Sequence, residues 1–393
     1  MNTLQDLKSR FNHLRIISAS NCGVAHLTMP AAEAINHATK KRLELGPLAF
    51  KDAEIEGARR QFAQEFGLLL NTSPDNISFV PSVNDGLTHV ALGILSRVHP
   101  KRPKIALYKS EYPSNVFPWT RPDSKIGFDP VWVLGERGTG DRPLRFSVQE
   151  FKRALDENPE ISVVSVSSVQ FESGFKTDLE ALGRVCQNRN VWFVVDAAQS
   201  LGSMPLDPKQ IHASVVTASG WKWLGGPEGS AVLYTSPEFR NWIKRPGMFG
   251  PDARVQKSYS DPGYTPAPGG KMFELSTCNY GLISGLGATV KENQNAIGSD
   301  KIWEEISRLQ TIFLDRLRAP NMQLVDLQAD ERAGILSFVV NTDPGNVVAR
   351  LAEKGLILPA PRGGYLRVAL HWFLTDEQVN QAADLLSADL KSV

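Results

Sequence analysis

The sequence predicts an α/β protein with a large, mostly parallel sheet flanked by helices and a smaller α+β domain at the C-terminal end. Residues 161–166 and 191–195 are apolar runs typical of strands that are buried on both faces of a parallel sheet. Residues 178–188 between them are long enough for a crossover helix, and strand, helix and strand in succession favour parallel pairing. With 393 residues the chain can form two domains rather than one.

The remaining elements follow from local patterns. Residues 54–70 carry apolar side chains at helical spacing on one face, and residues 76–80 begin a strand. A polar turn at 81–86 then opens an apolar helix, and residues 104–108 form another predicted strand. After residue 280 we expect one long helix that runs to about residue 318 and links the two domains.

The C-terminal part has its own pattern of elements. A strand is predicted at 334–340 and a helix at 346–356, before a closing strand that ends near 372. The Pro- and Gly-rich stretch at 245–270 excludes regular structure there.

Composition excludes several classes of protein. Apolar residues make up 42%, charged residues 22%, and the formal net charge is +1, as in ordinary globular proteins. Lysine and arginine are scattered without a basic stripe, which argues against nucleic acid, and no apolar run reaches the ~20 residues that span a membrane. The N-terminus lacks the apolar core of a secretory signal, and the three cysteines lack metal-ligand spacing. We therefore expect a cytoplasmic protein without a metal site.

A carboxylate and an amine follow two strands that can be neighbours. Asp196 stands at the end of the strand 191–195, at the edge where open α/β sheets bind ligands. Lys222 follows a second apolar run, 213–218. Pyridoxal 5'-phosphate (PLP) needs this pair, because a lysine holds it as a Schiff base and an acid keeps its pyridine nitrogen protonated. Taken singly, Asp196 could cap a loop and Lys222 could be a surface lysine.

The motifs around this pair, DAAQSLGSMPLD and SGWKWLGGPEGSAVLY, resemble the class V aminotransferase family of PLP-dependent fold type I enzymes. That family includes cysteine desulfurases, selenocysteine lyases and kynureninase. The resemblance implies that Lys222 is the Schiff-base lysine and that Asp196 pairs with the pyridine nitrogen. It also implies that Gln199 bonds the ring oxygen and Ser219 the phosphate, while Trp221 stands where many members carry a histidine.

Three further cofactor contacts are implied by the same resemblance. Val83 and Asn84 occupy the turn with which the family holds the cofactor phosphate, where free N–H groups at a helix start attract an anion. Tyr112 occupies the place of the aromatic ring stacked on the pyridine. Thr277 lies in FELSTCN, which resembles a loop that crosses the dimer interface to the partner's phosphate. The resemblance thus implies a homodimer with shared active sites.

The resemblance also implies which residues bind the substrate. Arg367 matches the arginine of the family's closing strand, which pairs with the substrate α-carboxylate through a guanidinium fork. Asn21 lies in a segment, residues 14–30, that resembles the family's entry segment, which reaches the mouth of the active site. Gln170, or Ser168 two positions before it, lies near the place where desulfurases carry an asparagine that holds the substrate. This chain has no asparagine there. The domains implied are an N-terminal segment (1–30), a large PLP-binding domain (31–280), and a linking helix with a small domain (281–393).

The reaction is predicted from what the chain lacks. Desulfurases and selenocysteine lyases carry a persulfide-forming cysteine on a loop shortly before the closing arginine, and residues 351–367 contain no cysteine. We expect a PLP enzyme that forms a carbanion from an amino acid, or a molecule bearing one, and acts as a C–S or C–C lyase without that cysteine. A class V aminotransferase or epimerase is the alternative, and an inactive PLP-binding regulatory protein is another.

Overall fold

The computed structural model describes residues 4–11, 13–97, 103–122, 124–138, 143–255 and 262–391. Its centre is a seven-stranded sheet in the order β2-β10-β9-β8-β7-β3-β4. The strands are β2 (Ile77–Val80), β3 (Lys104–Tyr108), β4 (Asp129–Val133), β7 (Ile161–Ser167), β8 (Trp192–Asp196), β9 (Val215–Ser219) and β10 (Ala231–Thr235). All pairs from β9 to β4 are parallel, and β10 pairs antiparallel with both of its neighbours, β9 and β2. The predicted mostly parallel sheet is confirmed.

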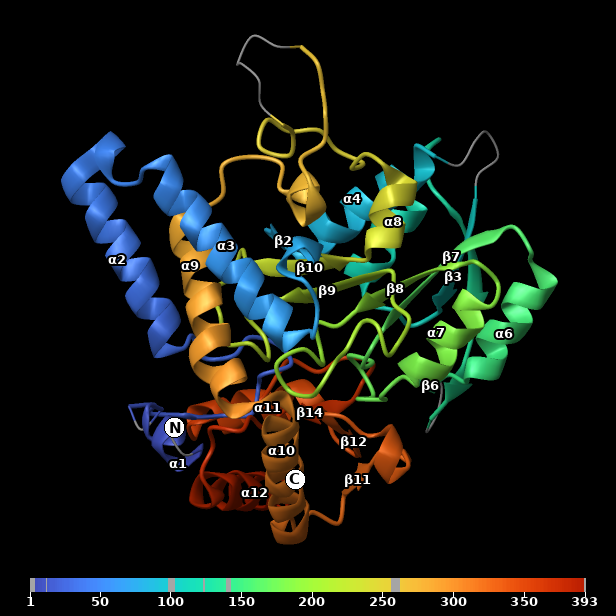
Figure 1. The fold of residues 1–393 in the computed structure, drawn as a ribbon. Helices are drawn as coiled ribbons and strands as arrows, with labels where there is room; N and C mark the ends of the chain where they lie inside the picture. Colours follow the sequence, from blue (N-terminus) through green and yellow to red (C-terminus); the bar gives the residue numbers. More distant parts are fainter. Residues whose placement is uncertain are drawn as a thin grey trace.

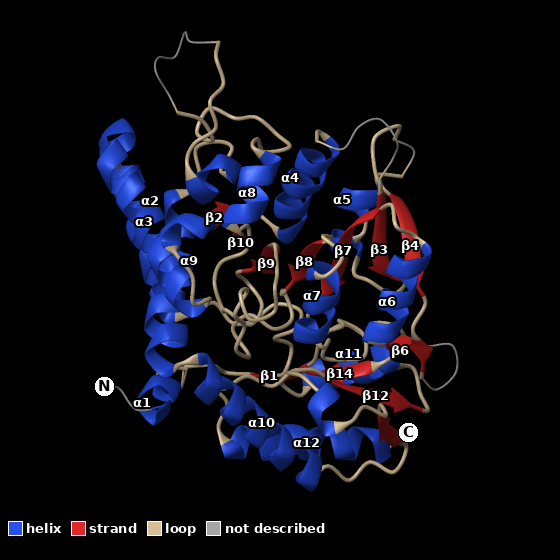
Figure 2. Ribbon diagram, turned by 45° about the vertical axis from the view of Figure 1, so that its right-hand side comes forward, coloured by secondary structure: helices blue, strands red, loops and turns tan. Residues whose placement is uncertain are grey.

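Helices cover both faces of this sheet (Figures 1 and 2). Successive side chains of a strand point to opposite faces, so Val194 packs into one apolar core and Val195 into the other. One face is covered by α4 (Val83–Leu95), α5 (Phe117–Thr120) and α8 (Pro237–Ile243). The other is covered by α3 (Asp52–Leu69), α6 (Val148–Glu157), α7 (Leu179–Gln187) and α9 (Tyr280–Thr289). A short hairpin, β5 (Glu136–Arg137) with β6 (Pro143–Arg145), lies outside the sheet.

The expectation of one continuous linking helix after residue 280 is wrong. Helix α9, which packs on α2 (Met29–Leu45), continues as a π-helical segment over Val290–Asn295. Gly298 then adopts a φ of +91°, a conformation that only glycine reaches without strain. A separate helix, α10 (Ser299–Arg316), begins directly after it. The π segment and the glycine turn the chain from the large sheet toward the small domain.

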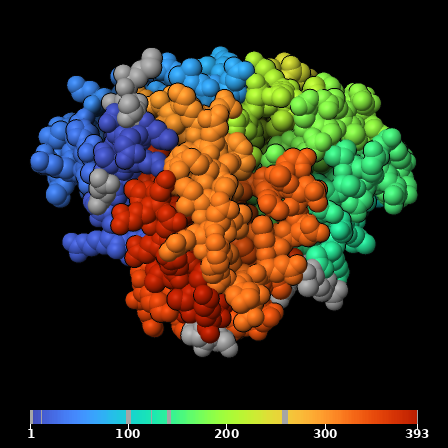
Figure 3. All heavy atoms as spheres, turned by 90° about the horizontal axis from the view of Figure 1, so that it is seen from below, coloured from blue at the N-terminus to red at the C-terminus, as the bar shows by residue number. Residues whose placement is uncertain are grey.

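The small domain occupies the end of the molecule seen from below in Figure 3, where residues coloured orange and red form the middle of the surface. It contains an antiparallel sheet of β11 (Met322–Leu324), β12 (Leu336–Val340) and β14 (Leu366–Val368), with the helices α10, α11 (Pro344–Glu353) and α12 (Asp376–Lys391). The N-terminal segment joins it, because β1 (Ile17–Ser18) pairs with β13 (Leu356–Ile357). The predicted domain boundaries themselves stay a prediction.

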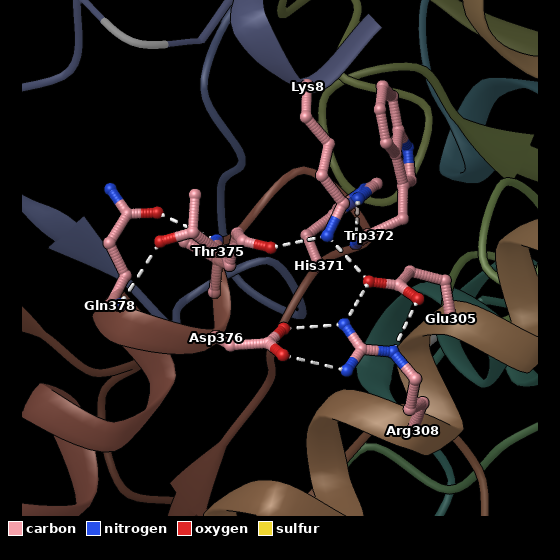
Figure 4. A network of polar contacts seen from close by, with 9 residues as sticks. Lys8, Glu305, Arg308, His371, Trp372, Thr375, Asp376 and Gln378 are labelled. Atoms are coloured by element: carbon pink, nitrogen blue, oxygen red, sulfur yellow. Dashed lines mark hydrogen bonds and ion pairs between the residues drawn. The ribbon is translucent and has the colours of Figure 1, made fainter. Parts of the chain in front are cut away.

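Helix α1 (Leu4–Ser9) is fixed to the small domain by buried charges (Figure 4). Lys8 Nζ lies 2.5 Å from Glu305 Oε1 and also donates to the carbonyl of Leu374. Arg308 bridges the same Glu305 to Asp376 at the start of α12. The Lys8–Glu305 pair is buried, whereas Arg308 and Asp376 are largely exposed. Removing Glu305 would therefore leave Lys8 buried without a counter-charge, which is the costly way to break such a network. In the described part of the chain, no helix is both long and apolar enough to cross a membrane.

Candidate active site

A cavity of about 390 Å³ opens at the carboxyl edge of the sheet, beside the ends of β8 and β9. These strands are adjacent and parallel, with Asp196 paired to Thr217, so their terminal residues Asp196 and Ser219 meet at one edge. The predicted neighbourhood of the two strands is confirmed. Predicted site residues that line the cavity are Val83, Asn84, Tyr112, Asp196, Gln199, Ser219, Trp221, Lys222 and Arg367.

Lys222 projects into this cavity from the turn after β9. Its Nζ lies 5.4 Å from the centre of the Tyr112 ring, so an aromatic face and the amine share the same space. Burial lowers the pKa of Lys222, and the charge of Arg367 acts in the same direction, while Asp196 partly opposes it. A lowered pKa increases the fraction of neutral amine, which is the form that attacks a carbonyl group.

Asp196 supplies the acid of the cavity and is only 4% exposed. Burial raises the pKa of its carboxyl, while the N–H of Ala198 and the charge of Lys222 favour the ionised form. The Ala198 N–H group donates to Asp196 Oδ1 over 2.9 Å and fixes the side chain. A buried carboxylate of this kind is stabilised by a cation that binds against it.

An anion site lies beside this pair. The hydroxyl of Ser219 is buried and, within the described residues, has no hydrogen-bond partner. Ser82, the N-cap of the 13-residue helix α4, lines the same cavity together with Val83 and Asn84. Because buried polar groups are rarely left unpaired and a helix start offers free N–H groups, this end suits a phosphate.

Gln199 is held by a chain of contacts that leads to the small domain. Its Nε2 donates to the carbonyl of Cys22 over 2.8 Å, and its Oε1 accepts from Trp223 Nε1 over 3.1 Å. His371 Nε2 lies 3.0 Å from the carbonyl of Trp223, while His371 Nδ1 accepts the N–H of Trp372. Burial lowers the pKa of His371 to about 4, so the neutral ring donates through Nε2. The sequence pattern around His371 indicates no role for it, and the contact of Gln199 with the ring oxygen stays a prediction.

Arg367 forms one wall of the cavity and is 4% exposed. Its Nη1 donates to the carbonyl of Phe171 and its Nη2 to the carbonyl of Ala360, both over 2.6 Å. The Nε atom has no partner among the described residues. The guanidinium group is therefore fixed in place and keeps donor capacity for a carboxylate in the cavity.

Three predicted site residues do not line the cavity. Asn21 is fully buried and donates to the carbonyl of Ala369, and Gln170 donates to Glu111 over 3.2 Å. Thr277 is exposed on the surface of the single chain. The proposed roles of these residues stay predictions, and that of Thr277 requires a second copy of the chain.

Glu111 was missed by sequence reasoning. This buried carboxylate lies in the loop after β3 and accepts the backbone N–H and the hydroxyl of Ser167, over 2.7 and 2.5 Å. Burial raises the pKa of Glu111, and the nearby charge of Asp196 adds to the effect. The available signal was an acid at the carboxyl end of a predicted strand, directly before Tyr112.

The sheet, with its lysine and carboxylate at the carboxyl edge, defines the class as PLP-dependent fold type I. The model of the family "Aminotransferase class-V" matches residues 49–365, so the chain belongs to the class V aminotransferase family and is a PLP-dependent enzyme. A probable cysteine desulfurase of Pyrococcus abyssi is 30% identical over 82% of this chain and 81% of its own length. An uncharacterized aminotransferase of Bacillus subtilis, YcbU, is 24% identical over 94% of this chain and 93% of its own length.

Solved structures confirm the fold. The apo cysteine desulfurase of Thermococcus onnurineus NA1 superposes with a TM-score of 0.85 at 22% identity, covering 100% of this chain and 99% of the other. The cystine C–S lyase C-DES, solved with its product cysteine persulfide, has a TM-score of 0.82 at 22% identity, covering 95% and 97%. At these identities the likeness establishes the architecture and leaves the reaction open.

Proposed function

We propose that this enzyme is an amino-acid lyase that breaks a C–S or C–C bond of its substrate without a persulfide-forming cysteine. The cavity carries the PLP and amino-acid part of this proposal, and the relative named as a probable cysteine desulfurase favours breakage of a C–S bond. The cavity combines Lys222 and Asp196 with a buried, fixed Arg367, and the segment 358–365 before the strand of Arg367 contains no cysteine.

The lining residues fit the cofactor. Lys222 would hold it, Asp196 would face its pyridine nitrogen, and Ser219 with the start of α4 would hold its phosphate. When bound, PLP withdraws the electrons left at Cα when a bond there is broken. Tyr112 would cover the ring and exclude water.

Arg367 orients the substrate by its α-carboxylate. The Lys222 amine, once free of the cofactor, accepts and returns the proton at Cα, because its lowered pKa suits both directions of transfer. These roles are common to lyases, aminotransferases and epimerases, so the choice of lyase depends on the product.

Cys22 is the thiol that lines the cavity, and it fits a persulfide carrier poorly. It is buried, its carbonyl is held by Gln199, and burial raises the pKa of its thiol. A thiol that takes sulfur from the substrate and carries it as a persulfide must be mobile and must react as a thiolate. We also place the enzyme in the cytoplasm, because its three cysteines are free and such thiols persist in reducing compartments.

The proposal is tested by measuring products from cystine, S-methylcysteine and alanine. A lyase releases pyruvate and ammonia from the first two in equal amounts, without an added keto acid, and Cys22→Ala does the same. Product that appears only with a keto-acid acceptor indicates an aminotransferase, and conversion to the D isomer indicates an epimerase. Either outcome contradicts the proposal, as does a protein that holds PLP and turns over none of a broad amino-acid panel.

Arg367→Lys is expected to weaken substrate binding by ~1.5–3 kcal/mol, because lysine keeps the charge but loses the second hydrogen bond. The cofactor spectrum should not change, since Arg367 faces the substrate. The measurement is kcat and KM for an amino acid and for the amine that lacks its carboxylate. If the parent prefers the plain amine, or the variant binds amino acids equally well, Arg367 does not hold the carboxylate.

We further propose that the enzyme is a homodimer in which Thr277 reaches the partner's cofactor phosphate. Thr277→Ala should then weaken PLP binding roughly tenfold, the scale of one hydrogen bond to a charged group, without dissociating the dimer. Ser276→Ala, at an equally exposed neighbour, is the matched control. Light scattering that finds a monomer with full cofactor occupancy would overturn the shared site.

A further inference from the structure

A second arginine, Arg362, lines the mouth of the same cavity. Its backbone carbonyl accepts the N–H of Tyr365 over 2.9 Å, which closes a tight turn. The two central residues, Gly363 and Gly364, have φ of +57° and +77°, so the turn requires glycine at both positions. The turn therefore fixes the backbone position from which the side chain of Arg362 extends.

This turn is anchored on both sides. The hydroxyl of Tyr365, whose side chain is fully buried, donates to the carbonyl of Pro143 over 3.0 Å. A Cβ added to Gly363 would lie 2.9 Å from the carboxyl carbon of Glu172, so this glycine packs directly against that side chain. The turn leads within two residues to Arg367 on β14, so one short segment supplies both guanidinium groups.

The charges that line the cavity are unbalanced. Three cations, Lys222, Arg362 and Arg367, face one carboxylate, Asp196. Within the described part of the chain, Arg362 forms no ion pair. Burial raises the pKa of Glu172, and the charges of Arg367 and Arg362 oppose this rise only in part. In the proposed site Lys222 holds the cofactor and Arg367 holds the α-carboxylate. Among the described residues, no group assigned to the cavity so far forms an ion pair with Arg362.

We infer that Arg362 binds a second anionic group of the substrate, so that the enzyme prefers amino acids whose side chain ends in a carboxylate or another acid. This inference rests on the proposed role of Arg367 at the α-carboxylate. A guanidinium fork at the mouth suits such a group, because a carboxylate accepts two parallel N–H bonds. An exposed position makes the contribution modest and sensitive to salt.

The test uses two ligands of equal chain length that cannot react, glutarate with two carboxylates and pentanoate with one. Calorimetric titration of the holoenzyme should give about fivefold tighter binding of glutarate at low salt, which is the scale of an exposed ion pair. The preference should shrink in about 0.5 M salt, because salt screens exposed charges. Arg362→Gln should abolish the preference and leave pentanoate binding unchanged. Arg362→Lys should retain part of it.

Arg153→Gln is the matched control, because Arg153 is an exposed arginine on α6 outside the cavity lining and its loss removes the same charge. That variant should keep the glutarate preference. Equal affinities in the parent enzyme, or a preference that survives Arg362→Gln, would overturn the inference while leaving the lyase proposal intact. If neither ligand binds the parent, the carboxylate site at Arg367 is wrong as well, and both proposals lose their basis.

Discussion

Lys222→Ala should remove the covalent attachment of PLP and lower turnover at least ~10³-fold, because one amine both holds the cofactor and moves the proton at Cα. The parent should absorb at ~420 nm, the band of a lysine-bound pyridoxal. The variant should lose this band after gel filtration while it retains weakly bound cofactor, since Ser219 and the start of α4 are unchanged. Absorbance spectra and steady-state rates provide the measurement.

The control for this variant is Lys209→Ala, which removes an exposed lysine outside the cavity. It should keep both the absorption band and the turnover of the parent. A Lys222→Ala protein that still carries the band would mean that another lysine holds the cofactor.

Asp196→Asn should leave the cofactor attached and lower turnover by about 10²–10³-fold, the scale of losing one preorganised electrostatic contact. Asparagine keeps an acceptor for the N–H of Ala198, so the fold of the loop after β8 is preserved and the loss reports the charge alone. Without a carboxylate, the pyridine nitrogen is no longer held protonated and withdraws electrons less strongly.

This prediction is checked by single-turnover rates together with the absorption spectrum. Asp196→Ala should lower the rate at least as far, because it removes the charge and the acceptor together. An Asp196→Asn enzyme that turns over as fast as the parent would show that Asp196 does not contact the ring nitrogen.

The sheet could be predicted from the sequence because its central strands are continuous apolar runs. The predicted strand at 104–108 coincides with β3, and the runs ending at Asp196 and before Lys222 became the adjacent strands β8 and β9. In a parallel sheet the carboxyl ends of adjacent strands meet at one edge. The proximity of Asp196 and Lys222 could therefore be predicted from the local pattern of apolar residues.

Contacts between distant segments could not be predicted in this way. The bond between His371 and Trp223 joins residues 148 positions apart, and nothing in the local sequence of either residue indicates it. Glu111 accepts a hydrogen bond from the N–H of Ser167 at the end of β7, a strand that approaches it only in the folded sheet. The break after α9 depends on the conformation of Gly298, which a helical pattern of apolar residues does not reveal.

Reduction of the holoenzyme with borohydride, followed by peptide mapping, tests most directly whether this cavity is the cofactor site. The reduction fixes PLP to whichever lysine holds it. We predict a single modified peptide that carries the added mass on Lys222, and no modification in Lys222→Ala. A modified peptide that excludes Lys222 would contradict the assignment of the cavity and, with it, the roles of Asp196 and Arg367.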